Sequence, residues 1–418
     1  MKILVVGSGG REHAIIWKLS KSPKAPKIYC APGNGGIAAL AECVPIKTMD
    51  TEAIVSFSKE NKIDLVVVAP EDPLAAGMVD ALEAQGIRAF GPSAKAAVIE
   101  ASKSFSKDLM KKYGIPTAEY EVFDDSQNAI EYLKGKSFPI VVKADGLALG
   151  KGVIIANDFN EAKEAVLNIM EDKAFGEAGS RVVIEEFLSG QEVSVLAFTD
   201  GKTVVPMVSS QDHKRALDND MGLNTGGMGT FSPSRIYTDE MAKYCMENVY
   251  KTTIEAMNKE GRKFKGIIYF GLIITKDGPK VLEYNARFGD PETQVVLPRL
   301  SFDLVEIFEA VIDERLDTLD IRWDDNAAVC VIMASGGYPG KYQTGYEISG
   351  MEDAEKDGAV VFHAATKLED GKYTTSGGRV IGVTAVDETL DKAIKRAYEY
   401  VGKISFKDAH FRKDIGIK

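Results

Sequence analysis

Four short apolar runs within the first hundred residues constrain the fold of this chain more than any other feature. They read ILVVG, KIYCAPG, LVVVAP and RAFGP, and they alternate with helix-like stretches at Glu12 to Leu19 and Ala75 to Glu83. Apolar runs of this kind are typical of strands buried on both faces, and intervening helices make such strands parallel. We therefore predict an N-terminal doubly wound parallel sheet whose ligand crevice lies at the carboxyl ends of its strands.

Length and charge narrow the classes of function. The chain has 418 residues, which is too long for one hydrophobic core and predicts two to four domains. Its 51 basic and 62 acidic residues give a net charge of −11, which disfavours a broad surface for nucleic acid or anionic membrane. No apolar run approaches membrane-spanning length, and the four cysteines form no CxxC pair, so we expect a soluble protein of the reducing cytoplasm.

Three loops follow the first three strands, GSGGREH, APGN and APEDPL. The first is similar to a dinucleotide fingerprint, but Glu12 stands where a small residue is needed and no acid ends the second strand, which disfavours a nicotinamide cofactor. Gly9 and Gly10 precede a helix, so their loop could still bind an anion through free backbone N–H groups. A tight turn without a ligand is the alternative.

The stretch KVLEYNARFGDPETQ carries the strongest chemical signal. Glu283 and Asn285 are two residues apart on a predicted strand and therefore project from the same face. A carboxylate beside an amide oxygen suits Mg²⁺, which takes few protein ligands, and Arg287 adds a planar fork for phosphate or carboxylate. The alternative is an ordinary surface hairpin, which is disfavoured because polar side chains this dense are costly without partners.

Three further stretches carry weaker signals. In FPIVVKADGLALGKGVIIA, two β-rich runs flank a glycine-rich turn, with Lys143 on the first run and Lys151 in the turn. In RVVIEEFLSGQEVSVLAF we expect a strand, a turn and a strand, where Glu185 to Leu188 could meet an adenine edge and Glu192 a ribose. A hairpin with solvated acids is an equal alternative. The third stretch, at 102–113, predicts a lysine-bearing helix, most of whose lysines we expect to face solvent.

Charged and glycine-rich segments continue toward the C-terminus. QDHKR and NTGGMG are dense in charge and glycine, although His213 by itself could be a structural histidine. We expect a long helix over 237–260 and a hairpin over 266–285 that presents the metal face. From 325 onward the pattern predicts strands at 327–334, 359–365 and 379–386, then an amphipathic helix over 388–403 that packs on a core.

Taken in chain order, GSGGREHA, APGN, APEDPL, VVKADGLALGKGV, QDHKRA, NTGGMG, LEYNARFGDPETQ, ASGGYPG and TSGGRV resemble the motifs of the ATP-grasp enzymes and, within them, of the glycinamide ribonucleotide synthetase family. The resemblance covers nearly the entire chain. It implies an N-terminal doubly wound parallel-sheet domain over 1–101, a central ATP-grasp domain over 102–325 with a mobile lid at about 116–190, and a small C-terminal α/β domain over 326–418. It also implies a reaction that joins glycine to 5-phosphoribosylamine through glycyl phosphate, with cleavage of ATP to ADP and phosphate.

The resemblance further implies a role for each matching residue. Mg²⁺ or Mn²⁺ would be held by Glu283 and Asn285. Residues bordering the reacting centre would be Arg287, Asp212 and Lys214. ATP would be bound by Lys103 or Lys107 and by Lys143, Gly146, Gly150, Lys151, Gly152, Glu185, Glu186, Leu188 and Glu192. The sugar substrate, phosphoribosylamine, would be bound by the N-terminal loops through Gly9, Gly10, Arg11, Glu12, Glu71 and Asp72. Glycine would be bordered by Asn224, Gly226, Gly227 and Met228. Gly289 and Asp290, also expected to bind substrate, would complete the site beside Arg287.

Several points stay open at this stage. The strand at 266–275 has no carboxylate, although many ATP-grasp relatives carry a metal ligand there, so the number of metal ions is undetermined. We expect a monomer without a nucleic-acid or membrane partner. The alternatives are another ATP-grasp ligase or a biotin-independent carboxylase, and a nucleotide-binding regulatory protein that has lost catalysis. Intact Lys143, Glu283, Asn285 and Arg287 disfavour the last.

Overall fold

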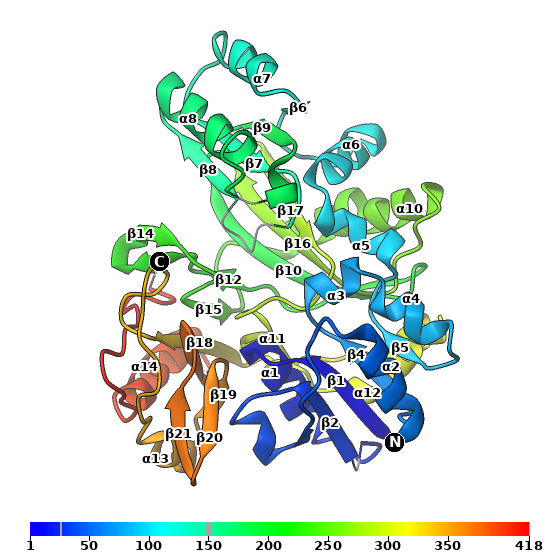
Figure 1. Ribbon diagram of the computed structural model, residues 1–418, viewed down its shortest axis with the longest axis vertical. Coiled ribbons are helices and arrows are strands. Elements are labelled where there is room, and N and C mark those ends of the chain that lie inside the picture. Colours follow the sequence, from blue (N-terminus) through cyan, green and yellow to red (C-terminus); the bar gives the residue numbers. More distant parts are fainter. Residues whose placement is uncertain (26, 148–151, 175, 418) are drawn as a thin grey trace.

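The N-terminal part of the chain is a five-stranded parallel sheet in the order β3-β2-β1-β4-β5 (Figure 1). The computed structural model describes residues 1–25, 27–147, 152–174 and 176–417. The strands are β1 (Lys2–Gly7), β2 (Lys27–Pro32), β3 (Glu42–Cys43), β4 (Leu65–Val68) and β5 (Ala89–Phe90). The first four apolar runs thus form the predicted parallel sheet.

Helices connect these strands, and the first begins directly at the predicted anion loop. In α1 (Gly10–Leu19), the Glu12 carboxylate accepts a hydrogen bond from the N–H of Gly9 at 2.6 Å, which caps the helix start. The helix expected over 75–83 is instead two short helices that break at Gly77, whose φ is 86°. The helices of this region are η1 (Ile37–Ala39), α2 (Thr51–Glu60), α3 (Glu71–Ala75), α4 (Met78–Glu83) and α5 (Ala94–Ala101).

The central part contains two antiparallel sheets. One has the order β6-β9-β7-β8 and lies at the top of Figure 1, and the other has the order β11-β10-β16-β17. The strands of the first are β6 (Tyr120–Phe123), β7 (Ile140–Ala144), β8 (Val153–Ala156) and β9 (Val182–Glu186). Those of the second are β10 (Gln191–Thr199), β11 (Val204–Pro206), β16 (Gly266–Thr275) and β17 (Gly278–Asn285).

The two strands expected within 181–198 do not pair with each other. β9 belongs to the upper sheet and β10 to the lower one, so the turn between them crosses from one sheet to the other. Hairpin geometry was the alternative reading of this stretch, and it is wrong because each strand finds better partners distant in sequence. The residues between Glu185 and Glu192 consequently lie at the junction of the two sheets.

Helices cover these sheets, and the upper sheet has a core of its own. That core joins α7 (Ser126–Leu133) and α8 (Phe159–Met170) to β7 and β9, and it is separate from the other hydrophobic clusters. The helix expected over 237–260 has a π-helical turn in its middle: α9 (Asp239–Cys245), η4 (Met246–Lys251) and α10 (Thr252–Lys259). The remaining helices here are α6 (Lys103–Tyr113), η2 (Gly176–Gly179), η3 (Asp218–Asp220), α11 (Thr293–Arg299), α12 (Leu304–Ile312) and η5 (Leu316–Thr318).

The C-terminal strands form an antiparallel sheet that incorporates two strands from the central region, in the order β12-β15-β18-β22-β19. Its members are β12 (Gln211–Asp212), β15 (Gly229–Ser232), β18 (Ala327–Ala334), β19 (Val360–His363) and β22 (Arg379–Asp387). Two small hairpins accompany it: β13 (Arg215–Leu217) with β14 (Met221–Asn224), and β20 (Thr366–Glu369) with β21 (Lys372–Thr375). The helices are α13 (Met351–Lys356) and α14 (Leu390–Val401), and α14 packs on the sheet as expected.

The predicted class is therefore confirmed, with a parallel sheet first and antiparallel sheets after it. Within the described part of the chain, no helix is long and apolar enough to cross a membrane.

Candidate functional site

Glu283 and Asn285, the predicted metal ligands, lie at the end of β17. As expected, β17 pairs with β16. Glu283 faces Gly271 and Asn285 faces Tyr269 across the two strands, and a bulge interrupts the register next to Gly271. The Glu283 side chain is 33% exposed, so a cation could reach it. Burial raises the pKa of Glu283, but Lys214 and the other nearby cations lower it by more than burial raises it. The pKa therefore lies below its usual value.

A buried group of lysines lies beside this strand, contributed by α6 and by the upper sheet. The carboxylate of Glu185 forms ion pairs with two of these lysines, at 2.8 Å from Lys107 Nζ and 2.9 Å from Lys143 Nζ. The side chains of Lys107 and Glu185 are each only 2% exposed. Burial lowers the pKa of Lys107 to about 8, although Glu185 counteracts part of that shift. We call Lys103, Lys107, Lys143 and Glu185 the lysine cluster.

Lys103 ties the lysine cluster to the glycine-rich turn. Its Nζ donates to the carbonyl of Gly146 at 2.9 Å, and burial lowers its pKa. Gly152 closes the turn by accepting from the N–H of Ala144 at 2.8 Å. Gly150 and Lys151, which were predicted to bind phosphate, lie outside the described residues.

The predicted adenine and ribose residues lie where the chain crosses between the sheets. Glu186 accepts from the N–H of Glu119 at 3.0 Å, and Leu188 is partly buried. The carboxylate of Glu192 lies 2.8 Å from Lys214 Nζ, and Glu283 lies 3.7 Å from that same nitrogen. Lys214 therefore connects Glu192, predicted to bind the ribose, with Glu283, predicted to bind the metal.

The QDHKR and NTGGMG segments come together in space. The N–H of Met228 donates to the backbone carbonyl of His213, and the N–H of Thr225 donates to the backbone carbonyl of Lys214, both at 2.8 Å. Gly227 has a φ of 110°, and a Cβ there would lie 2.7 Å from Asp212 Oδ1, so only glycine fits. Burial, followed by the neighbouring Glu292, raises the pKa of Asp212 well above its usual value.

Other residues of these two segments have mainly structural surroundings. The Met228 side chain is fully buried, and Asn224 lies on β14 opposite Arg215. His213 Nδ1 lies 3.2 Å from the carbonyl of Gly229, and burial lowers its pKa to about 4. The alternative interpretation of His213 as a structural histidine is therefore the better one.

A second group of charged side chains joins the N-terminal loops to the segment that follows β17. Arg11 lies 2.5 Å from Glu12 and 3.4 Å from Glu71, whose carboxylate is also 3.3 Å from Arg287. Arg287 reaches Glu100 at 3.1 Å. We call Arg11, Glu12, Glu71, Glu100 and Arg287 the arginine cluster. It physically connects the predicted sugar loops to the strand that carries Glu283 and Asn285.

Charges inside the arginine cluster hold Glu71 ionised, whereas burial raises the pKa of Glu100. Burial alone would raise the pKa of Glu71, but Arg287 and Arg11 lower it to about 2. Asp72, predicted with Glu71 as a substrate ligand, is exposed on the first turn of α3.

Asp290 joins the same region from the segment after β17. Its Oδ1 accepts from Gln294 at 2.8 Å. A Cβ on Gly9 would lie 3.4 Å from its Oδ2, and a Cβ on Gly10 would lie 3.7 Å from its Oδ1. Gly289 is buried beside Glu292. The structure thus brings Gly9, Gly10 and Asp290 together.

Sequence reasoning missed two residues that organise this region, Glu100 and Arg379. Glu100 is 7% exposed and accepts from the N–H of Ala286 at 2.7 Å, directly between Asn285 and Arg287. Arg379 donates to the carbonyls of Gly226 and Asp290. The only sequence signal for Arg379 was its place in TSGGRV, and Glu100 had none because its partners are far away in the chain.

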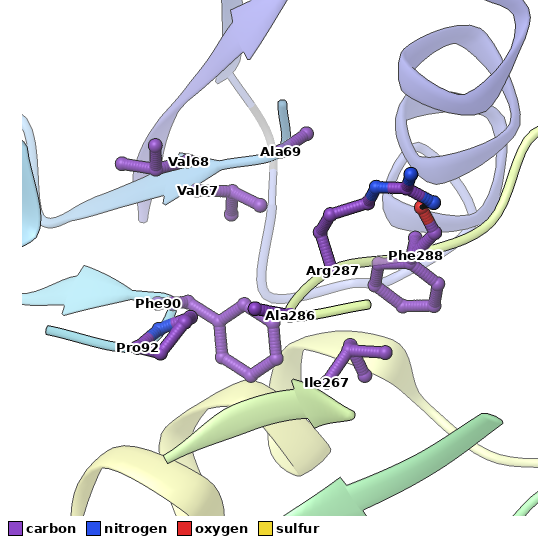
Figure 2. Close-up of a pocket in the computed structure, with 10 residues that line it drawn as sticks. Val67, Val68, Ala69, Phe90, Pro92, Ile267, Ala286, Arg287 and Phe288 are labelled. Carbon is purple, nitrogen blue, oxygen red and sulfur yellow. Dashed lines mark hydrogen bonds between the residues drawn. The ribbon is translucent and has the colours of Figure 1, made fainter. Parts of the chain in front are cut away.

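A small void lies next to Arg287, between β4, β5 and the segment after β17. Its volume of about 10 Å³ holds no more than a single water. Figure 2 shows the Arg287 guanidinium turned away from the apolar side chains of Val67, Phe90 and Ile267. The void is therefore a packing defect and not a substrate site.

The oxygen donors on β17 fit a hard divalent cation. Among residues 1–25, 27–147, 152–174 and 176–417, no three His, Cys, Asp or Glu side chains gather closely enough to hold a metal ion. Glu283 and Asn285 form a two-ligand set, which is what Mg²⁺ commonly uses when waters and phosphate oxygens complete its octahedron.

Two antiparallel sheets that enclose buried lysines, beside a strand ending in an acid and an amide, define an ATP-grasp protein. Three family models match consecutive parts of the chain: the N domain of phosphoribosylglycinamide synthetase at residues 1–100, its ATP-grasp (A) domain at 101–293 and its C domain at 328–418. The chain belongs to the phosphoribosylglycinamide synthetase family.

Individual relatives agree with the family models. The chain is 50% identical over 415 residues to phosphoribosylamine-glycine ligase of Caldanaerobacter subterraneus, covering 99% of each chain. A crystal structure of phosphoribosylamine-glycine ligase from Thermotoga maritima matches with a TM-score of 0.85 and 32% identity, covering 99% of this chain and 100% of that one. A biotin carboxylase domain of Hydrogenobacter thermophilus 2-oxoglutarate carboxylase, solved with MgADP and bicarbonate, shares the fold at a TM-score of 0.75 and 16% identity, covering 98% and 91%.

Proposed function

We propose that this chain is an ATP-dependent ligase that joins glycine to 5-phosphoribosylamine and releases ADP and phosphate, the second step of de novo purine synthesis. Relatives named for this reaction match over the full length. The structural observation that supports the proposal is the contact of Glu71 with both Arg11 and Arg287, since these residues join the predicted sugar loops to the segment that follows β17.

Binding of the nucleotide follows from the distribution of charge. The lysine cluster pairs Lys107 and Lys143 with one carboxylate, which leaves cationic charge for the phosphates of ATP. The adenine would lie at the crossing between the sheets near Glu186 and Leu188, with Glu192 at the ribose. Glu283 and Asn285 would hold Mg²⁺ or Mn²⁺. When bound, the cation neutralises negative charge on the terminal phosphates.

The first step is phosphoryl transfer to glycine. A carboxylate oxygen of glycine attacks the γ-phosphorus, the bond from that phosphorus to the β-phosphate oxygen breaks, and ADP leaves. Catalysis of this kind depends on positioning and on neutralising charge, so Lys143 and Lys214 would supply positive charge and no protein nucleophile is needed. The product of the step is glycyl phosphate.

The second step forms the amide bond. The amine nitrogen of phosphoribosylamine attacks the carbonyl carbon of glycyl phosphate, the bond from that carbon to the phosphate oxygen breaks, and phosphate leaves with the electron pair. The amine must lose a proton. The acceptor we propose is Asp212, because it lies against Gly227 of the NTGGMG loop and because burial, then Glu292, raises its pKa and makes its carboxylate more basic.

A phosphate-release assay tests the proposal. Purified protein should release phosphate at full rate only when ATP, glycine, phosphoribosylamine and Mg²⁺ are all present, and the release should be matched by amide product. Replacing glycine and the amine with bicarbonate tests the carboxylase alternative. Bicarbonate is the appropriate substrate for this test because a biotin carboxylase domain solved with bicarbonate shares the fold. Equal rates with bicarbonate would reject the ligase assignment.

We also propose that the enzyme acts as a monomer in the cytoplasm and binds neither nucleic acid nor membrane. The net charge of −11 supports only the last part, because it repels nucleic acid and anionic membranes. Sedimentation at micromolar concentration should give a mass near 45.4 kDa, whereas twice that mass would show a dimer.

A further inference from the structure

Arg379 begins β22 in the C-terminal sheet, outside the ATP-grasp sheets, yet its side chain extends into the candidate site. The side chain is 20% exposed. One guanidinium nitrogen, Nη1, donates to three backbone carbonyls, those of Gly226 at 2.5 Å, Gly227 at 3.3 Å and Asp290 at 2.9 Å. The other, Nη2, lies 3.4 Å from the carboxylate of Asp290. A single side chain therefore joins two loops that are more than sixty residues apart in sequence.

The two loops are predicted to serve different substrates. Gly226 and Gly227 belong to the loop next to Asp212, on the side assigned to glycine. Asp290 lies against Gly9 and Gly10, on the side assigned to the sugar. Because Arg379 binds both loops, its position determines how far apart the two substrates lie.

The chemistry of arginine suits this connection. Its planar guanidinium presents donors in a rigid fork, whereas the ammonium of lysine is a point charge with flexible geometry. A lysine at this position could keep one of the contacts but could not donate in two directions at fixed angles. Nearby Asp212 and Asp290 keep the guanidinium charged, since both raise its pKa against the effect of burial.

We propose that Arg379 is a positioning residue that aligns the amine of the sugar substrate with the activated glycine. This inference rests on the proposed function. It assigns to the C-terminal sheet a direct part in the second chemical step and none in ATP binding, because Arg379 contacts neither the lysine cluster nor β17 itself.

Misalignment has a specific chemical consequence. When the amine is displaced, water attacks the carbonyl carbon of glycyl phosphate in its place, and the bond from carbon to the phosphate oxygen breaks to give glycine and phosphate. ATP is then cleaved without amide product. A displacement of about 1 Å can cost about 100-fold in rate.

The test compares the phosphate released with the amide formed for Arg379→Gln and Arg379→Lys. We expect amide formation to fall about 100-fold, with glycine-dependent phosphate release falling less than tenfold and the KM for ATP unchanged. The lysine variant should recover only part of the coupling. Arg396→Gln is the matched control, since Arg396 lies in the same part of the chain and is an exposed arginine that also pairs with an aspartate, Asp387.

A second variant keeps the inference testable if the arginine variants do not fold. Gly226→Ala would place a Cβ 3.1 Å from Cζ of Arg379 and should displace the guanidinium while leaving its charge in place, so it should also raise the ratio of phosphate to amide. Equal losses of phosphate and amide in folded variants would overturn the positioning role. Absence of amide formation by the wild-type protein would instead reject the proposed function.

Discussion

The lysine cluster and the arginine cluster both lie near Glu283 and have opposite ratios of cations to carboxylates. In the first, Lys107 and Lys143 share the single carboxylate of Glu185. In the second, Arg11 and Arg287 face three carboxylates, those of Glu12, Glu71 and Glu100. The first arrangement keeps cationic charge available for a polyanion, and the second consumes it internally.

This difference in charge ratio gives the two clusters different roles, ligand binding for the lysine cluster and structural support for the arginine cluster. An arginine already paired with two acids gains little from a further anion, because its charge is compensated. Arg287 also donates to Asn285 Oδ1 at 3.3 Å, so it orients a predicted metal ligand. The arginine cluster thus acts as a frame for the end of β17, while the lysine cluster is the part that is prepared for ATP.

The largest expected effect comes from Glu283, where the influence of both clusters meets. Lys214, Lys143, Lys103 and Arg287 all lower its pKa, so Glu283→Gln removes a charge that both sides use. We expect turnover to fall about 1,000-fold while the free energy of unfolding changes by less than about 1 kcal/mol. Phosphate release measured across a range of Mg²⁺ concentrations checks this.

The control for this variant is Glu255→Gln on the exposed face of α10, which should behave as wild type. A Glu283→Gln protein with wild-type turnover at low Mg²⁺ would show that the metal lies elsewhere.

The second effect is on stability, through Glu185. Glu185→Gln leaves Lys107 and Lys143 buried without a counter-charge, and loss of one partner from a buried ion pair costs about 3 to 5 kcal/mol. ATP should stabilise this variant more than it stabilises the wild type, because its phosphates replace the missing carboxylate. Thermal unfolding with and without ATP measures both quantities.

Glu121→Gln provides the comparison for Glu185→Gln, since Glu121 is exposed on β6 of the same sheet. Equal stability of the Glu185 and Glu121 variants would mean that the lysine cluster is not held by its acid.

Local pattern was enough to predict strand β17, on which Glu283 and Asn285 lie, and the strand β16 beside it. Glu283 and Asn285 were assigned from spacing alone, because strand geometry determines which face a side chain takes. The parallel N-terminal sheet followed in the same way from its apolar runs. The family resemblance added the roles of separate motifs, since spacing within one motif says nothing about which distant motif it meets.

Pairing between distant segments was the part that the sequence could not give. β9 and β10 were read together because only a short turn separates them, but their sheet partners lie elsewhere in the chain. Glu100 and Arg379 were missed for the same reason. A solvated glutamate and one that accepts a buried backbone N–H look identical in sequence, and only the fold distinguishes them.

The smallest expected effect is the response of the arginine cluster to acid. The pKa of Glu71 is about 2 in the folded protein against an ordinary value of 4.5, so its stabilisation is complete above pH 4.5 and is lost as the pH falls toward 2. Glu71→Gln should therefore lower the free energy of unfolding by about 2 to 3 kcal/mol at neutral pH, and the gap from wild type should close in acid.

His13 also makes the protein less stable in acid, but this effect cancels when Glu71→Gln is compared with the wild type. Burial, then His363, lowers the pKa of His13 to about 3, so the unfolded state takes up this proton first and stability also falls from about pH 6.5 downward. Both proteins contain His13, and the difference between their denaturation curves at pH 7, 5 and 3 isolates Glu71. A gap that stays constant over this range would show that Glu71 acts by packing alone, and the arginine cluster would then not be the charge-compensated frame described above.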